Sequence, residues 1–310
     1  MSARKHRIVC GAALGMVLSV VAVYLALSNG RGAAPTSTPS RTPRPSIVTG
    51  PVTGGHWWRP GPRPIAWQWE LDHPLRLSSA ADMGFGGTTP AGAPAPRPTV
   101  YDIDGFDNPA STVAALHHAG DRVICYVEVG AVESYRPDSS RFPVSALGDD
   151  VPGYPDERYL DVTASTVLPI VESRIAMCKL KGFDAVEPDI DDSYSDRTGF
   201  PITEEANIAY DRALGEYAHT LGVAWGQKNG DADGVFSQSL EPVSDFVIDE
   251  QCFEYGTCAT VATPYLKAGK AVFEVEYSLP KSQFCSMANS EGFNSLLLDP
   301  SLAGSRQPCR

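Results

Sequence analysis

Eight short apolar segments recur along this chain, and each of them ends in polar residues. They cover residues 65–71, 99–104, 122–130, 183–190, 223–230, 245–251, 271–277 and 293–299. Short apolar or β-branched runs of this kind are typical of strands that are covered on both faces. Helical patterns lie between most of them, over residues 111–119, 164–181, 203–221 and 260–268, and a glycine follows each one, as at many helix ends.

Strands that alternate with helices predict a parallel sheet. Eight of them in one domain, residues 65–310, favour a closed (β/α)8 TIM barrel over an open doubly wound sheet, and the length suits that fold. Two segments depart from the pattern. Residues 72–98 are rich in glycine and proline and contain no clear helical pattern, and only eleven residues follow the last strand, too few for a full eighth helix.

The N-terminal segment, residues 1–28, begins with Arg4, Lys5 and Arg7 and continues as an apolar run. This arrangement predicts a secretory signal peptide, although the run is also long enough for an uncleaved membrane anchor. Residues 29–64 are rich in Pro, Ser, Thr and Gly, which predicts an extended linker. In both cases the domain is expected outside the cell, secreted or extracellular, with membrane contact only through an uncleaved N-terminus.

The charge is strongly acidic beyond the leader. Residues 1–46 hold six of the 25 Lys and Arg and none of the 37 Asp and Glu, so the remainder carries 19 bases and a formal net charge of −18. Such a surface repels nucleic acid, which we exclude as a partner, and attracts cationic polymers. Solubility of an exported protein explains the same charge equally well.

Six of the seven cysteines lie beyond the leader, which suggests disulfides in an oxidising compartment. Cys252 and Cys258 flank a short loop and form one expected pair. Cys285 and Cys309 would tie down the C-terminus. Cys125 and Cys178 lie in apolar segments and are expected to be bridged or simply buried. The spacing matches no zinc motif.

Acidic residues gather at the predicted strand ends, where the active site of a barrel forms. Converging carboxylates repel one another unless some are protonated or meet positive charge, the state that general acid/base chemistry uses. Hydrolysis of a glycosidic bond needs such a pair, and neighbouring aromatic rings suit sugar stacking, although each ring alone is more often core. The residues in question are Asp102, Asp104, Glu128, Glu187, Asp189, Asp192, Lys228, Asn229, Glu250 and Glu276, with Trp69 and Tyr126 beside them.

Two other uses of these residues are less well supported. The Asp102-Ile103-Asp104 and Asp189-Ile190-Asp191-Asp192 segments offer hard oxygen ligands, but neither matches a recognisable metal motif, so no metal and no cofactor is expected. Lys228 resembles a Schiff-base lysine only in its position, because acidic neighbours raise a lysine pKa. We expect Lys228 to pair with carboxylates or to contact sugar hydroxyls.

Four segments resemble glycoside hydrolase family 114, the endo-α-1,4-polygalactosaminidases, which have a TIM-barrel fold. They are Tyr101-Asp102-Ile103-Asp104, residues 124–138, residues 183–189 and residues 250–255, and the resemblance extends over about residues 60–300. It implies cleavage of α-1,4-linked galactosamine polymers that are partly N-acetylated and therefore partly cationic, in agreement with the acidic charge.

The resemblance also implies a catalytic pair, an Asp after the fourth strand and a Glu after the sixth, which are Asp189 and Glu250 here. We assign Asp189 as nucleophile or stabiliser and Glu250 as general acid/base, with Asp192 as a rival to Asp189. The other strand-end residues are expected to bind substrate. Two alternatives stay open: a non-catalytic cell-surface carbohydrate-binding protein, which would not require both acids, and a metal-dependent hydrolase. We expect a monomer.

Overall fold

The computed structural model describes residues 56–302 and 306–310, and its main element is a nine-stranded sheet in the order β1-β2-β3-β7-β8-β9-β10-β11-β12. All of these strands run parallel except β12, which pairs antiparallel with β11. The eight predicted strands are confirmed. Their bounds are β1 Trp67–Glu70, β2 Val100–Asp104, β3 Arg122–Glu128, β7 Ala185–Asp189, β8 Ala224–Lys228, β9 Phe246–Glu250, β10 Ala271–Glu276 and β11 Asn294–Leu297, followed by β12 Gln307–Pro308.

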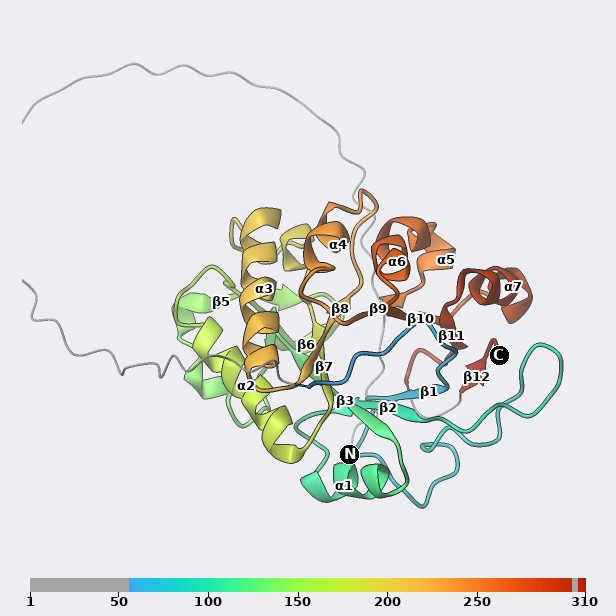
Figure 1. Cartoon of the computed structure of the whole chain (residues 1–310). Helices are drawn as coiled ribbons and strands as arrows, with labels where there is room; N and C mark the ends of the chain where they lie inside the picture. The colour runs from blue at the N-terminus through green and yellow to red at the C-terminus, as the bar shows by residue number, and fades with distance from the viewer. Residues whose placement is uncertain (1–55, 303–305) are drawn as a thin grey trace, which may run out of the picture. The chain divides into compact units, whose positions relative to one another are not determined.

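Helices cover the outside of this sheet (Figure 1). They are α1 Ala110–His118, α2 Leu168–Lys181, α3 Glu204–Thr220, α4 Val235–Leu240, α5 Cys252–Tyr255, α6 Cys258–Lys267 and α7 Lys281–Glu291, with short 3-10 turns at Ser139–Arg141, Val144–Ala146 and Ser193–Ser195. The four predicted helices correspond to α1, α2, α3 and α6. Within the described residues no helix lies between β1 and β2 or after β11, so the structure is a mixed α/β fold without the full ring of eight strand–helix units.

The sheet curls until its first and last parallel strands meet. No backbone ladder joins β1 to β11 in the described part of the chain. Instead the Trp67 indole donates a hydrogen bond to the Asn294 carbonyl at 2.8 Å, and the Ile65 amide donates to Asn294 Oδ1 at 2.8 Å. The curl encloses one apolar cluster to which every parallel strand contributes alternate residues, among them Trp67, Val100, Ile124, Ala185, Ala224, Phe246, Phe273 and Leu296.

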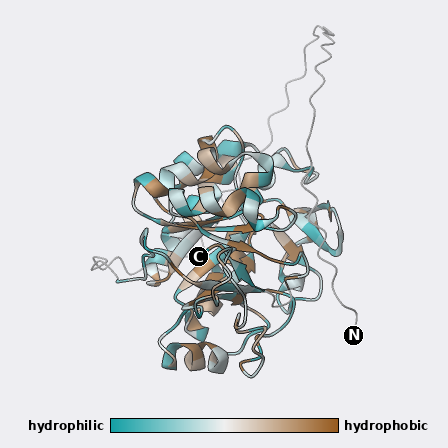
Figure 2. Cartoon of the chain, turned by 90° about the vertical axis from the view of Figure 1, so that its right-hand side faces the viewer, coloured by the Kyte–Doolittle hydropathy of each residue, from teal (hydrophilic) through white to brown (hydrophobic). Residues whose placement is uncertain are grey.

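This alternation decides which polar side chains face inward. Side chains two residues apart share a face of a strand. Continuing from the apolar inner residues toward the carboxyl ends, the same face carries carboxylates and a lysine: Asp102, Glu128, Glu187, Asp189, Lys228 and Glu250. The other face of the sheet packs its apolar side chains against the helices. Because the strands carry apolar residues on both faces, much of the central sheet is brown in Figure 2, the colour of apolar residues.

A three-stranded antiparallel sheet is inserted between β3 and α2. It is formed by β4 Ala131–Glu133, β5 Leu147–Val151 and β6 Tyr154–Leu160, in the order β4-β6-β5. Among residues 56–302 and 306–310, its strands form ladders only with one another. The sequence analysis assigned no structure to these residues.

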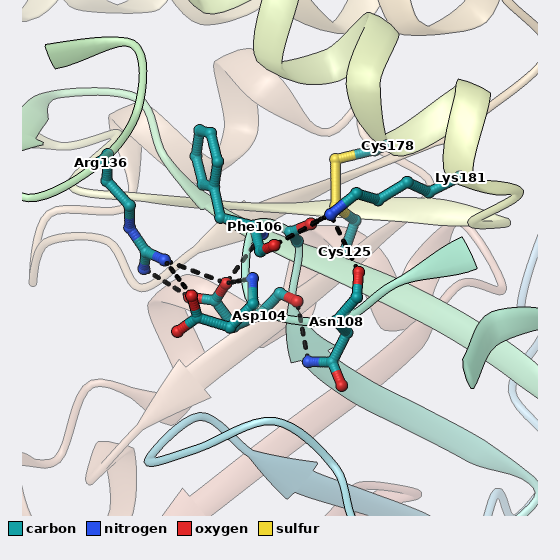
Figure 3. Close-up of a disulfide and its surroundings, with 9 residues drawn as sticks. Asp104, Phe106, Asn108, Cys125, Arg136, Cys178 and Lys181 are labelled. Atoms are coloured by element: carbon teal, nitrogen blue, oxygen red, sulfur yellow. Dashed lines mark hydrogen bonds and ion pairs between the residues drawn. A yellow bond between two sulfur atoms is a disulfide. The ribbon is translucent and has the colours of Figure 1, made fainter. Parts of the chain in front are cut away.

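The two expected disulfides, Cys252–Cys258 and Cys285–Cys309, form, and Cys125 and Cys178, for which bridging or simple burial was expected, are also bridged. The Cys125–Cys178 bridge ties β3 to α2. Beside it, Lys181 donates to the backbone carbonyls of Gly105, Phe106 and Asn108 at 2.6 to 2.9 Å, which anchors the loop after β2 (Figure 3).

The predicted signal or anchor, residues 1–28, and most of the predicted linker lie outside the described residues. Two residues at the end of that linker contact the domain: the Trp57 indole donates to Asp245 Oδ1 at 3.0 Å, and the Ala271 amide donates to the Pro60 carbonyl at 3.0 Å. In residues 56–302 and 306–310, no helix has the length and apolar character needed to cross a bilayer.

Candidate active site

Lys228 lies at the centre of the inward-facing polar cluster. Its ammonium group contacts Glu187 Oε1 at 3.2 Å, Asp189 Oδ1 at 2.9 Å and Glu250 Oε2 at 3.1 Å. Burial alone would lower the pKa of Lys228, but Asp189, Glu250 and Glu187 together raise it well above its usual value. The lysine is therefore a permanent cation that offsets part of the carboxylate charge, and its expected pairing with acids is observed.

Asp189 and Glu250 each have further hydrogen-bond donors. The Tyr126 hydroxyl donates to Asp189 Oδ2 at 2.6 Å, and the Tyr277 hydroxyl donates to Glu250 Oε1. Burial would raise the pKa of Asp189, but Lys228 and the hydrogen bond from Tyr126 outweigh it and hold that pKa below its usual value. Asp189 is therefore ionised across the neutral range.

The two carboxylates are reachable from solvent, although the lysine between them is not. The side chains of Asp189 and Glu250 are 23% and 18% exposed, whereas that of Lys228 is 4% exposed. Lys228 Nζ lies 2.9 Å from Asp189 Oδ1 and 3.1 Å from Glu250 Oε2. The distance between these two carboxylate oxygens therefore cannot exceed the sum of the two contacts. This limit applies to the two oxygens that face the lysine, and it favours the closer carboxyl spacing of about 5–5.5 Å found in retaining glycosidases over the about 6.5–9.5 Å of inverting ones.

A layer of buried groups supports this pair from below. The Trp69 indole donates to Glu187 Oε2 at 3.0 Å, and its ring centroid lies 4.9 Å from Lys228 Nζ. Since Trp69 is 1% exposed, it supports the lysine and offers no free face for sugar stacking. Burial, then the charge of Glu187 and a hydrogen bond with it, raises the pKa of Asp102 well above its usual value, so Asp102 is a neutral carboxyl beside Glu187.

The backbone turns sharply after three neighbouring strands. Ile190, Asn229 and Gln251, which follow β7, β8 and β9, have φ values of 57°, 48° and 56°. Positive φ is costly for residues other than glycine and concentrates at functional sites. Asn229 also forms two hydrogen bonds with Glu250: its Nδ2 donates to Glu250 Oε2 at 3.2 Å, and its Oδ1 accepts from the Glu250 amide at 2.9 Å. The strand ends are therefore held in one defined geometry.

Two residues predicted to bind substrate are engaged elsewhere. Asp104 forms a buried ion pair with Arg136 and also accepts the backbone amides of Phe106 and Asp107, so it organises the loop after β2 (Figure 3). Glu276 belongs to the outward-facing set of β10. Its Oε1 accepts the amides of Phe253 and Glu254, in the first turn of α5, at 2.9 and 3.2 Å, which caps that helix. Both residues lie at strand ends, as the sequence indicated. However, Glu276 lies on the outward face of β10 and Asp104 pairs with Arg136, so both side chains make structural contacts.

Asp192, the predicted rival to Asp189, lies just beyond β7 and is half-buried. Burial, then the charges of Asp196 and Asp189, raises the pKa of Asp192 to about 7. No contact of Asp192 with Lys228 or Glu250 is found in the described residues. Tyr154, which sequence reasoning missed, lies close enough that Asp189 and Glu250, after burial, raise its pKa. It comes from the inserted sheet, whose approach to the strand ends no local sequence signal reveals.

Three groups of acidic or histidine side chains in the described residues have ligand atoms within 4.8 Å of one another. They are Glu70 with His73 and Asp82, Glu128 with Glu133 and Glu157, and Glu204 with Asp231 and Asp233. None includes Asp189 or Glu250, whose counter-ion is Lys228.

Two solvent-reachable carboxylates share a buried cation at the carboxyl ends of a curled parallel sheet, the end where barrel enzymes have their active sites. Comparison with known families shows the class of the protein, a glycoside hydrolase. The profile of glycoside-hydrolase family GH114 matches residues 50–310, and the chain belongs to that family.

Solved structures show the same fold. The structure of Aspergillus fumigatus Ega3 in complex with galactosamine superposes with a TM-score of 0.72 at 31% sequence identity, over 82% of this chain and 98% of that one. The glycoside hydrolase domain of PelA from Pseudomonas aeruginosa superposes with a TM-score of 0.58 at 13% identity, over 78% of this chain and 97% of that one. A search of curated proteins found no match.

Proposed function

We propose that this protein is an extracellular, endo-acting glycoside hydrolase that cleaves α-1,4-linked polymers of galactosamine and N-acetylgalactosamine. The observation that carries the chemistry is the contact of one buried ammonium, that of Lys228, with two solvent-reachable carboxylates, Asp189 and Glu250. The substrate class is supported by the family, by the galactosamine in the Ega3 complex and by the formal charge of −18 beyond residue 46.

The partners of the two acids suggest their roles. Asp189, held ionised by Lys228 and Tyr126, is suited to attack the anomeric carbon. Glu250 then protonates the departing glycosidic oxygen and later takes a proton from the water that releases the sugar. Only one of the two acids needs to be ionised at each stage. Because Lys228 contacts both, it can stabilise Asp189 while Glu250 is protonated, and Glu250 after Asp189 has lost its charge in the glycosyl-enzyme.

The separation of the two acids favours retention of the anomeric configuration. Retaining enzymes place their carboxyl groups about 5–5.5 Å apart, and the wider spacing of inverting enzymes leaves room for a water. The shared contact with Lys228 Nζ, at 2.9 and 3.1 Å, does not leave that room between the oxygens that touch it.

The proposal is tested with purified protein on defined galactosaminan oligomers and polymer. The wild type is expected to release short oligomers, and Asp189→Asn and Glu250→Gln are each expected to lose at least about 100-fold in kcat while remaining folded by circular dichroism. Asp192→Asn is the matched control and should keep most of its activity. Wild-type turnover in Asp189→Asn with loss in Asp192→Asn would transfer the nucleophile role to Asp192. Binding without cleavage by the wild type would instead favour a carbohydrate-binding protein.

A further inference from the structure

The chain that leaves β3 runs directly against the turn that follows the proposed nucleophile. The amides of Val129 and Gly130 both donate to the carbonyl oxygen of Asp189, at 2.9 and 3.4 Å. The residue after Asp189 is Ile190, whose φ of 57° turns the chain away from the direction of β7. Gly130 is also the last residue before β4, so it joins the parallel sheet to the inserted sheet at this point.

Gly130 has no room for a side chain. A Cβ on this residue would lie 1.9 Å from the carbonyl oxygen of Ile190 and 3.0 Å from both its carbonyl carbon and its Cγ2. The φ of Gly130 lies outside the left-handed region, so its backbone conformation is open to other residues. A glycine is therefore required here by the close approach of the Ile190 carbonyl.

The glycine side of this contact is held in place from three directions. The carbonyl oxygens of residues 128–130 each accept a hydrogen bond of 2.7 to 2.8 Å, and the donors are Arg174 of α2, Tyr210 of α3 and Leu160 of β6. Ile190 is half-buried and begins the loop after β7. A side chain added at Gly130 would therefore displace the turn at Ile190.

Asp189 depends on the position of this turn. Its carboxylate contacts Lys228 Nζ at 2.9 Å and the Tyr126 hydroxyl at 2.6 Å, and the backbone amide of Ile190 also donates to it. These contacts together hold the pKa of Asp189 below its usual value. A displacement of about 1 Å, the least that moves the Ile190 carbonyl from 1.9 to 3.0 Å from a Cβ, would lengthen or break them.

We propose that Gly130 is a positioning residue for the nucleophile: the space left by its missing side chain admits the turn at Ile190, and this contact sets where the Asp189 carboxylate stands beside Lys228 and Tyr126. The proposal rests on the function proposed above and on the role of Asp189 in it. It gives the start of the inserted sheet a part in the reaction, one that affects the rate of bond cleavage more than the binding of substrate.

The test is Gly130→Ala, with Gly148→Ala as the matched control. A Cβ on Gly148, in β5, would lie 2.0 Å from the carbonyl oxygen of Thr198, so the control introduces the same overlap with a backbone carbonyl elsewhere in the inserted sheet. Both variants are expected to lower Tm. Gly130→Ala alone is expected to lower kcat on galactosamine polymer by about 100-fold, the effect of a displacement on the order of 1 Å, with KM nearly unchanged. The acid limb of its kcat–pH profile should also move upward, because the pKa of Asp189 rises.

Titration of the Asp189 carboxyl by carbon-13 NMR, with its signal assigned from Asp189→Asn, gives a readout independent of turnover. The pKa of Asp189 should be higher in Gly130→Ala than in the wild type and unchanged in Gly148→Ala. Neither substitution adds or removes a titratable group, so a moved pKa reports moved contacts. The charged groups around Asp189 that stay the same are Glu128, Glu187, Asp191, Asp192, Lys228 and Glu250.

Ile190→Gly is a second variant for the case in which Gly130→Ala does not fold. It introduces no overlap and frees the turn from its single conformation, so it should lower kcat and raise the pKa of Asp189 in the same directions. An unmoved pKa of Asp189 in the folded variant would overturn the positioning role, and so would equal losses of kcat in Gly130→Ala and Gly148→Ala. A wild type that cleaves no galactosamine polymer would remove the proposed function, whereas the NMR titration would still decide whether Gly130 positions Asp189.

Discussion

Replacing Lys228 by methionine is the most informative change, because it removes the shared cation and keeps most of the side-chain volume. Lys228 is 3% exposed and contacts three carboxylates. Breaking a buried ion pair by removing one partner typically costs about 3–5 kcal/mol. For a domain of this size each kcal/mol shifts Tm by about 2–4 °C, so we expect Lys228→Met to lower Tm by about 10 °C near pH 8.

The loss should shrink as the pH falls. In the wild type the lowered pKa of Asp189 contributes stability that is present above its unfolded-state pKa and is lost in acid. Without the lysine this contribution disappears, and the remaining carboxylates can be accommodated only by taking up protons. The variant is therefore expected to recover part of its stability as the pH falls toward 5, whereas the contribution of Asp189, which is lost only below its unfolded-state pKa, keeps a difference at that pH.

Differential scanning calorimetry of both proteins at several pH values between about 5 and 8 measures this dependence. Lys267→Met, on the exposed side of α6, is the matched control and should leave Tm nearly unchanged at every pH. A loss that is the same at both ends of the range would show that Lys228 acts through packing, and the electrostatic reasoning would then fail.

Three further predictions concern catalysis. The first-formed product should keep its anomeric configuration, and an inverted product detected by NMR would exclude Asp189 as nucleophile. Tyr126→Phe should lower kcat/KM about 10-fold, since it removes a hydrogen bond to a charged group, and should move the acid limb of the pH–rate profile upward as the pKa of Asp189 rises; an unmoved limb contradicts this role. The apparent KM for deacetylated polymer should rise with salt because a Debye length of about 10 Å at 0.1 M screens the acidic surface. An equal salt response with acetylated polymer would mean that the charge serves solubility alone.

The sequence predicted the parallel strands and the polar residues at their carboxyl ends because both depend on local patterns. Apolar segments of six to nine residues marked the buried strands, and the polar residues that end them marked the carboxyl ends of the sheet. Alternation along each strand also distinguishes Glu250 from Glu276. Glu250 lies on the same inward face of its strand as Ile248, whereas Glu276 lies on the face opposite to Val275, which points inward.

What the sequence could not predict depends on contacts between distant residues. The inserted sheet consists of short strands with mixed polarity, and nothing local shows that it folds toward the strand ends with Tyr154 and Glu157. The aspartate of β2 that pairs with Arg136 gave no local sign of its partner, which lies 32 residues further along the chain. The closing contacts between β1 and β11 are separated by more than two hundred residues and use an indole, so no strand pattern indicates them.

The inserted sheet places side chains beside Asp189 without belonging to the parallel sheet that positions this acid. Its strands exchange ladder hydrogen bonds only among themselves, so their sequence can drift without shifting the register of the parallel strands that hold Asp189 and Glu250. The insert is tied to the rest of the domain by Arg136, which pairs with Asp104, and by Phe142 and Leu160, which lie in the core cluster beneath the helices. Sequence changes between these anchors can therefore alter the surface beside Asp189 while the strand ends that carry Asp189 and Glu250 stay in place.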